Sequence, residues 1–597
     1  MPGIRKGFFI VLYLLIFSLS FSGDAEDGFI KIVVKKTKET APGYYSLSYK
    51  DMELFAFSSP VEALSTTTLN LQSRSFNSAI QSDFLLRGSN YEGARILLDG
   101  KNINDPQTGH HNSDIPFTRE DFSAADLVSG VSPSYFGPGS IGGEINFTTI
   151  RPDKRKIVFE LTGGEYGSFG QLFSATDKIG GLGGRVSFEN RESNGSRKDT
   201  DFKKITSSAA AGLDLPMGSL DLNFGYQEKE FGAYDFYTPG KGYPSKEWTK
   251  TFLADTGVNL KRDGFIFQTG LLWRRHFDKF MLDKDNIRSN FLSHHRTDIL
   301  SPRVYLGKDD TVIGKVGLGA EYSDQRINST TLGKHVRAQK SIFLDEGLSL
   351  DERISLNSRI RLDDYGEIDT ALTGATQAVY DFLNGNLLSL GVSRALRVPT
   401  FTELYYDDPT TMGNAGLSYE KSLSYEIGHI YSEGKLYFSS LIFLRDEENF
   451  VDWVKENPAQ VKWEAMNIAS SRVLGAEEQL RYEFNEHFRL NANYAYIDRE
   501  KSDDGYTYKY GENYVRHLVS AVSIFNFGFG EQEVGFTYKK PPSRAGWFLL
   551  HAKISISLNK SSKIFLWATN IFNVEYQEIP GIASPGRWIE GGLRLTW

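Results

Sequence analysis

The sequence predicts a transmembrane antiparallel β-barrel preceded by a smaller domain of mixed structure. Three observations support this fold class. Apolar and polar residues alternate from about Lys156 to the end of the chain, 13% of all residues are aromatic, and no segment beyond the N-terminus is apolar and long enough for a transmembrane helix. Aromatic girdles and two-sided strands are typical of membrane barrels. Without helices, only a closed barrel satisfies every backbone polar group inside a bilayer.

The N-terminus, residues 1–22, has the pattern of a secretory signal peptide. Arg5 and Lys6 supply positive charge, an apolar run follows from Phe8 to Phe21, and cleavage is expected after Ser22 or Ala25. The apolar run of about 14 residues is shorter than the roughly 20 residues that a membrane anchor needs. The chain has no cysteine, which excludes disulfides and thiol chemistry and suits passage through an oxidising periplasm.

Period-two alternation is clearest in four segments, which are Leu220–Gln227, Phe488–Tyr496, Ala552–Asn559 and Trp588–Trp597. The segments are about ten residues long, whereas strands of soluble proteins average five or six, so a soluble sandwich is the weaker interpretation. Tight turns and long polar connections both occur, as in outer-membrane barrels. At roughly 20 residues per strand with its connection, the remaining length of about 440 residues gives about 22 strands.

Residues 44–152 differ from the barrel region, residues 153–597, and predict a compact α+β domain. It contains a helix-like stretch, Asp51–Leu64, and a short strand, Arg95–Leu98. Gly137–Gly142 matches the pattern of a dinucleotide-binding loop, but a strand follows it where that fold needs a helix. We therefore expect a tight turn there. The net charge of −8 and the pI near 5.8 argue against a nucleic-acid-binding protein.

Several motifs, in this order along the chain, resemble those of TonB-dependent outer-membrane receptors. They are Phe84–Gly88, Ile96–Gly100 and Tyr135–Asn146 in the first domain, then Ser393–Tyr405, Gly413–Asn414, Glu420–Ser422, Tyr425–Gly428, Asn570–Asn573, Pro585–Arg587 and the terminal Trp597. The resemblance implies that the first domain is a plug inside the barrel lumen. It also implies a monomer surrounded by outer-membrane lipid that imports a scarce nutrient, energised by the TonB protein and its inner-membrane complex.

The plug segment Asp105–Asn112 and the barrel segment Phe231–Tyr237 look similar to receptors for cobalamin and siderophores. The resemblance therefore implies cobalamin or a related corrinoid as the first expected ligand and a ferric siderophore as the second. Two alternatives remain, a passive porin-like channel and a surface ligand-binding protein without energy coupling. We expect no enzyme, because the ten histidines show no nucleophile–base arrangement with Ser or Asp.

The candidate TonB-binding segment lies in residues 23–43 and comprises Ile30, Lys31, Ile32, Val33 and Val34. An extended β-branched run on an N-terminal segment can add as a strand to the edge of a partner's sheet. The following Lys35 and Lys36 depart from the family pattern, and the alternative is an ordinary plug strand. The resemblance also implies charged contacts of Arg87 in the plug with Glu426 and Glu477 in the barrel wall. Ser129 stands where the family usually has a second plug arginine.

Candidate ligand-binding residues are two histidines on an outward-facing plug loop and five aromatic residues, namely His110, His111, Tyr234, Phe236, Tyr237, Tyr405 and Tyr406. Imidazoles suit contact with a metal chelate, and aromatic rings can stack on a flat ligand. The alternatives are simple hydration or hydrogen bonding for the histidines and an outer aromatic girdle for the five aromatic residues. No cofactor is expected, apart from Ca²⁺ that Asp199, Asp201 and Asp235 would hold in early loops.

Overall fold

The computed structural model describes residues 41–597, except 58, 75–79, 132–136, 287–291, 313, 367–369, 458, 502–504 and 511–512. The expected signal peptide and the candidate TonB-binding segment Ile30–Val34 lie outside the described residues. Among the described helices, none has the length and apolar character required to cross a membrane.

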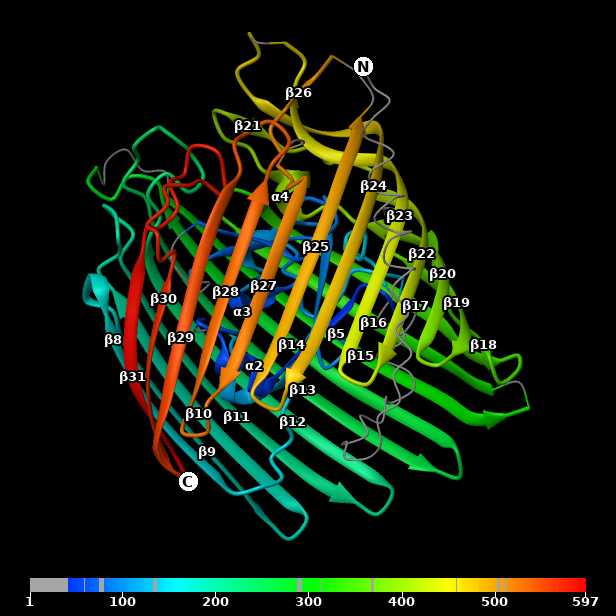
Figure 1. Ribbon diagram of the computed structural model, residues 1–597. Coiled ribbons are helices and arrows are strands. Elements are labelled where there is room, and N and C mark those ends of the chain that lie inside the picture. Colours follow the sequence, from blue (N-terminus) through cyan, green and yellow to red (C-terminus); the bar gives the residue numbers. More distant parts are fainter. Residues whose placement is uncertain are drawn as a thin grey trace, which may run out of the picture. The chain divides into compact units, whose positions relative to one another are not determined.

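Twenty-two antiparallel strands close into a barrel within the described part of the chain (Figure 1), so the predicted fold class and strand count are confirmed. The strands are β8 (Lys156–Gly164), β9 (Phe169–Ile179), β10 (Leu182–Ser193), β11 (Phe202–Leu215), β12 (Gly218–Gly232), β13 (Lys246–Arg262), β14 (Phe265–Met281), β15 (Leu292–Thr311), β16 (Gly314–Ser329), β17 (Gly333–Ser349), β18 (Ile354–Asp364), β19 (Thr370–Leu383), β20 (Asn386–Arg397), β22 (Glu420–Glu433), β23 (Leu436–Lys455), β24 (Trp463–Asn485), β25 (Phe488–Lys501), β27 (His517–Asn526), β28 (Gly530–Lys540), β29 (Trp547–Asn559), β30 (Ser562–Thr569) and β31 (Trp588–Thr596). Two short strands, β21 (Thr411–Met412) and β26 (Thr507–Tyr508), add to β24 and β23 in the long loops.

The seam of the barrel joins its last strand to its first. β31 pairs antiparallel with β8, with Leu593 opposite Leu161. Beyond the end of β31, the backbone of Trp597 exchanges two hydrogen bonds with Ile157, each 2.9 Å long. The chain end is therefore part of the wall, and no sheet edge is left open at this position.

The two ends of the barrel differ in their connections. Short turns join β9 to β10, β13 to β14 and β24 to β25, whereas residues 233–245, 398–419 and 570–587 form long loops at the other end. The long loops lie at the top of Figure 1 and the C-terminus at the bottom. Outer-membrane barrels place their short turns in the periplasm and their long loops outside the cell.

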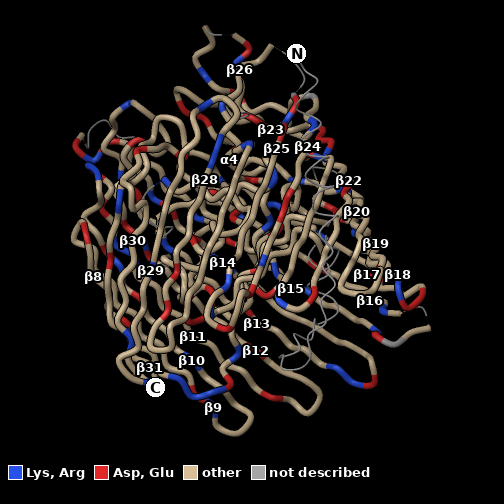
Figure 2. Tube along the Cα trace, in the orientation of Figure 1, with Lys and Arg blue, Asp and Glu red and all other residues tan. Residues whose placement is uncertain are grey.

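The wall has an apolar outer face and a polar inner face. Along β10, Leu182, Val186 and Phe188 are exposed, whereas Arg185 and Glu189, which point to the other face, are buried. A soluble protein shows the opposite arrangement, because its apolar side chains are the ones that avoid solvent. Figure 2 shows β29 and β30 with few charged residues along their length. The outer face therefore matches lipid, and the inner face matches a polar lumen.

The plug contains a five-stranded sheet in the order β1 (Tyr44–Ser48), β6 (Phe122–Val128), β7 (Gly143–Thr149), β4 (Ala94–Leu98) and β5 (Lys101–Asn102). A second, two-stranded sheet pairs β2 (Asn70–Ser73) with β3 (Ser82–Leu85). Three one-turn 3₁₀ helices also belong to the plug, η1 (Leu64–Thr66), η2 (Gly109–His111) and η3 (Arg119–Asp121), and a fourth, η4 (Glu165–Gly167), lies in the barrel.

The helix-like stretch that the sequence predicts at Asp51–Leu64 is broken into two short helices, α2 (Tyr49–Leu54) and α3 (Pro60–Ala63). Ser48 and Asp51 form a reciprocal capping box that starts α2. Pro60 occupies the first turn of α3, where its missing amide hydrogen is tolerated, so a new helix begins there instead of continuing the first.

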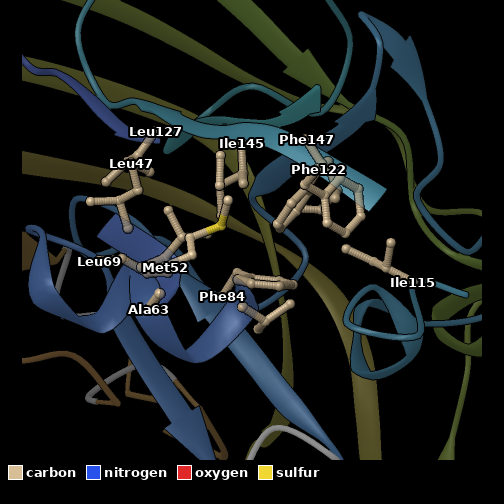
Figure 3. Packing of buried hydrophobic residues seen from close by; sticks show 14 of the residues in the cluster. Leu47, Met52, Ala63, Leu69, Phe84, Ile115, Phe122, Leu127, Ile145 and Phe147 are labelled. Carbon is tan, nitrogen blue, oxygen red and sulfur yellow. The ribbon is translucent and has the colours of Figure 1, made fainter. Parts of the chain in front are cut away.

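The plug has its own hydrophobic core. Leu47, Met52, Leu127, Ile145 and Phe147 pack between the five-stranded sheet and α2 (Figure 3). The glycine-rich turn before β7 packs against other backbone as expected, since the Gly142 amide donates to the Gly93 carbonyl at 2.9 Å. Gly143 has a φ of 137°, and a Cβ there would lie 2.5 Å from the Val128 carbonyl oxygen. Only glycine fits this position.

Replacing Phe147 by alanine is expected to destabilise the plug by about 3–5 kcal/mol, because its fully buried ring leaves a cavity. Hydrogen exchange of plug amides in the detergent-solubilised protein measures this loss. Phe188→Ala is the matched control, because this ring is exposed on the outer face of β10. Equal exchange in the two variants would contradict the assignment of the plug core.

Candidate functional site: the plug and the wall around it

Arg87 joins the plug to the barrel wall through two carboxylates. Its guanidinium donates to both oxygens of Glu477 on β24, at 3.3 and 3.2 Å, and to Glu426 on β22 at 3.0 Å. All three side chains are buried. The structure thus brings together the three residues that the sequence places in plug–wall contact. A bidentate arginine–carboxylate pair combines strength with a fixed geometry.

Ser129, which replaces the second arginine of the family pattern, reaches the same carboxylates without adding charge. Its hydroxyl donates to Glu477 at 2.6 Å, and the backbone amide of Val131 donates to Glu426. From the wall side, Arg445 on β23 donates to the Arg87 carbonyl at 2.9 Å. The plug therefore binds the two glutamates with one guanidinium and two neutral donors.

Arg87→Ala is expected to weaken the attachment of the plug by about 3–5 kcal/mol, because Glu426 and Glu477 would stay buried without their cation. Faster hydrogen exchange at the end of β3 and at Val131 would report this loss. Arg472→Ala on β24 removes an exposed ion pair with Asp446 on β23 and serves as the control, with no measurable change expected. Unchanged exchange in Arg87→Ala would refute the proposed attachment.

The plug loop 105–114 is buried, so the expectation that His110 and His111 face outward on a polar loop is wrong. His110 Nδ1 lies 2.8 Å from Asp83 Oδ1, and its ring stacks on Tyr91 with centroids 4.0 Å apart. Burial lowers the pKa of His110 to about 4. His111 is also buried and lies 3.5 Å from Asp278 on β14. Both histidines therefore have a polar partner, His110 in the plug and His111 in the wall.

The aromatic candidates divide into packing residues and partly exposed ones. Phe236 is 2% exposed and packs with Phe231 and Ile80, so it belongs to a hydrophobic cluster and not to a ligand-facing surface. The hydroxyl of Tyr237 donates to Glu247 at 2.9 Å, and Tyr234 is half-buried in the same loop.

The two tyrosines of the long loop after β20 are also half-buried. Tyr405 stacks on His335 of β17 with centroids 3.5 Å apart, and the Tyr406 hydroxyl donates to Asp408. Together with Tyr234 and Tyr237, they are the aromatic candidates that keep some exposed surface.

The short helix α4 (Phe401–Tyr405) attaches the tyrosine-bearing loop to the plug. The amides of Phe401 and Thr402 donate to the plug carbonyls of Pro106 and Gln107 at 2.9 and 3.1 Å. The motif Ser393–Tyr405 indicates the family, but it does not predict this contact between the loop and the plug. Any ligand that moves this loop therefore acts on the plug through two backbone hydrogen bonds.

A buried ion-pair network fixes α4 in turn. Arg397, at the end of β20, donates to both carboxylate oxygens of Glu403 in α4, at 2.8 and 2.9 Å, and to both of Glu420 at the start of β22. Glu403 also accepts from the Thr400 amide and so completes the capping box of α4. The loop is thereby held to the wall on one side and to the plug on the other.

Glu92 of the plug lies close enough to this network to interact with the charges of Glu403 and Arg397. It accepts hydrogen bonds from the Gly109 amide at 2.8 Å and from the Thr108 hydroxyl at 3.2 Å. Burial, reinforced by the negative charge of Glu403, raises the pKa of Glu92 to about 8. At neutral pH the folded protein therefore holds this carboxyl largely in its protonated form.

The raised pKa of Glu92 predicts that loop 105–114 is less stable at high pH. Ionisation is easier in the unfolded state, so stability falls as pH rises from about 4.5 towards 8, by roughly 1.4 kcal/mol per pKa unit. Glu92→Gln should remove this dependence, as measured by loop hydrogen exchange at pH 5 and pH 8 after correction for intrinsic rates. Glu352→Gln, in an exposed short turn, should keep it. A pH dependence that survives in Glu92→Gln would exclude Glu92 as its source.

The three aspartates expected to hold Ca²⁺ are not gathered into one site. Asp199 pairs with Lys284, and Asp235 accepts from the Gly242 amide at 2.7 Å. Within the described residues, two groups of three close metal-ligating side chains occur, and neither includes Asp199, Asp201 or Asp235. Both groups contain His111.

The plug does not fill the lumen evenly. A cavity of about 350 Å³ lies between the plug and the wall near the short turns. Its lining includes Arg95 and Lys101 of the plug and Arg303, Arg359 and Arg361 of the wall, together with Asp99, Asp221, Asp255 and Glu321. The lining carries both charges, and Lys101 pairs with Asp255 and Arg361 with Glu321 across it.

Comparison with known proteins identifies the family. The family described as TonB dependent receptor-like, beta-barrel matches residues 64–571. The chain belongs to this family. The receptor is therefore an outer-membrane protein of bacteria. Its family is one of receptors and transporters and not a class of enzymes. A comparison with curated proteins found no match.

Solved structures share the fold of the receptor at low sequence identity. The siderophore receptor PirA of Pseudomonas aeruginosa is 14% identical, with a TM-score of 0.74, over 93% of this chain and 99% of that one. The ferric enterobactin receptor PfeA of Pseudomonas aeruginosa, in complex with enterobactin, is 14% identical, with a TM-score of 0.76, over 94% and 100%. PirA of Acinetobacter baumannii is 13% identical, with a TM-score of 0.77, over 93% and 98%.

Proposed function

We propose that the receptor imports a ferric siderophore across the outer membrane and that the TonB protein supplies the energy. The observation that carries this proposal is a plug fixed inside the barrel by buried ion pairs, in a chain of the TonB-dependent receptor family. A lumen closed in this way disfavours a passive porin-like channel. The similar solved structures named above are siderophore receptors, which favours this cargo over cobalamin.

The contacts suggest how binding and energy act on the plug. A ligand held by the loop that carries Tyr405 and Tyr406 reaches the plug through α4 and its two backbone bonds to Pro106 and Gln107. From the other side, TonB would pair with Ile30–Val34 as an added strand and pull. The cavity near the short turns lies between the plug and the wall, and Arg303 in its lining offers hydrogen-bond donors to an anionic chelate.

Deleting Ile30–Lys36 is expected to abolish uptake of radiolabelled iron chelate while leaving binding at the cell surface unchanged. Uptake falls because the strand that TonB would pair with is gone. Ile32→Val is the matched control and should transport normally, because a β-branched residue is kept. Uptake that survives the deletion would show that this segment does not couple energy. Binding without uptake in the unaltered receptor would favour the surface-binding alternative.

Equilibrium binding to the detergent-solubilised receptor tests the cargo. The panel contains ferric catecholate and hydroxamate siderophores and cyanocobalamin, each with and without Ca²⁺. Nanomolar binding of one ferric siderophore supports the proposal. Binding of cyanocobalamin alone would overturn the proposal of a ferric siderophore. It would support cobalamin, the first ligand that the resemblance implies. Liposome swelling by the intact receptor would instead support a passive channel.

A further inference from the structure

A second cluster of side chains lies between plug loop 105–114 and the adjacent wall strands β13, β14 and β15, which are neighbours in the barrel. We call it the His111 cluster, and its members are Asp105, His111 and Asp114 of the plug and Glu247, His276, Asp278 and His295 of the wall. All seven are buried. None of them takes part in the Arg87 contacts or the α4 network described above.

The donor atoms of the His111 cluster have the spacing of a metal site. The ligand atoms of His111, Asp114 and His276 lie within 4.8 Å of one another, and so do those of His111, Glu247 and Asp278. His276 Nε2 is 3.1 Å from Asp114 Oδ2, and His111 Nε2 is 3.5 Å from Asp278 Oδ2. Two donors bound at about 2.1 Å to a tetrahedral ion lie about 3.4 Å apart.

The carboxylates of the His111 cluster have different partners. Asp105 pairs with Arg274, and Asp114 pairs with Lys229. In the part of the chain that the structure describes, Asp278 has only histidines, His111 and His295, as its ion-pair partners, and Glu247 accepts a hydrogen bond from Tyr237. A bound divalent cation would give these two buried carboxyl groups a stronger partner.

Three polar atoms of the cluster have no hydrogen-bond partner among the described residues. They are Asp278 Oδ1, His276 Nδ1 and His295 Nδ1, and all three are buried. Buried polar groups are nearly always satisfied, so each exception calls for a missing partner such as an ion. A cation held by His111, Glu247 and Asp278 would supply that partner to the Asp278 carboxylate.

We propose that the His111 cluster binds one divalent transition-metal ion, which bridges the plug to the barrel wall. The donors are imidazole nitrogens and carboxylate oxygens, a set that suits Zn²⁺. Ca²⁺ and Mg²⁺ prefer sites made of oxygen alone. Because ligands would come from loop 105–114 and from β13 and β14, the ion clamps the loop that also contacts α4. This proposal does not depend on the identity of the imported ligand.

Zinc binding to the untagged, full-length, chelator-treated receptor in detergent tests the proposal by isothermal titration calorimetry. One Zn²⁺ ion per chain is expected, and excess Ca²⁺ should not compete. His111→Ala and His276→Ala should each weaken binding at least 100-fold. His294→Ala is the matched control and should bind normally, because this histidine is exposed on the other face of β15. No stoichiometric binding in the unaltered receptor would overturn the proposal, and so would full binding in both variants.

Folding of the variants is checked independently by the heat-dependent gel mobility of the barrel. Asp278→Asn is the second variant, because it nearly preserves side-chain volume and removes one ligand charge. Hydrogen exchange provides a second measurement. Zn²⁺ should protect loop 105–114 in the unaltered receptor and leave its exchange unchanged in Asp278→Asn. Protection that persists in Asp278→Asn would place the ion elsewhere and refute the site.

Discussion

A wall with an apolar outer face must turn its polar side chains inward. The plug has to provide these buried side chains with hydrogen-bond and ion-pair partners. The inner face of β10 alone presents Arg185, Glu189 and Arg191 to the lumen. Each such group is costly to bury unless it is paired. The plug therefore combines a small apolar core with a charged surface that pairs with the wall. Asp121 of the plug, for example, pairs with Arg185 of β10.

The need to pair buried charges explains why Arg87 and Arg397 each contact more than one carboxylate. In both places one guanidinium serves two carboxylates inside a shielded lumen. The first ties the plug to the wall, and the second ties an outer loop to the wall beside the plug. A movement of the outer loop and a pull on the N-terminal side of the plug therefore act on the same small domain through different contacts. The plug is held to the wall by ion pairs at several separate places, and its apolar core also contacts Leu253 and Leu272 of the wall.

The sequence predicts the barrel well because alternation is a local signal that repeats in every strand. It also identifies Arg87, Glu426 and Glu477, although only through the family resemblance. The stretch Asp51–Leu64 is predicted as one helix but is two, because Pro60 starts a new one. The outward-facing position of His110 and His111 is predicted wrongly, because it depends on partners distant in the chain such as Asp83. The His111 cluster is invisible in the sequence, since its ligands are far apart along the chain and meet only when the barrel closes.

The seam between β8 and β31 also sets the order of assembly. The plug precedes the first barrel strand, and the last residue of the chain completes the wall beside Ile157. The barrel therefore cannot close before β31 has been exported. Because the plug precedes β8 in the chain, the plug residues are exported before the strand that closes the barrel. A chain without Trp597 would lose the two backbone hydrogen bonds to Ile157 that follow the last strand pairing of the barrel.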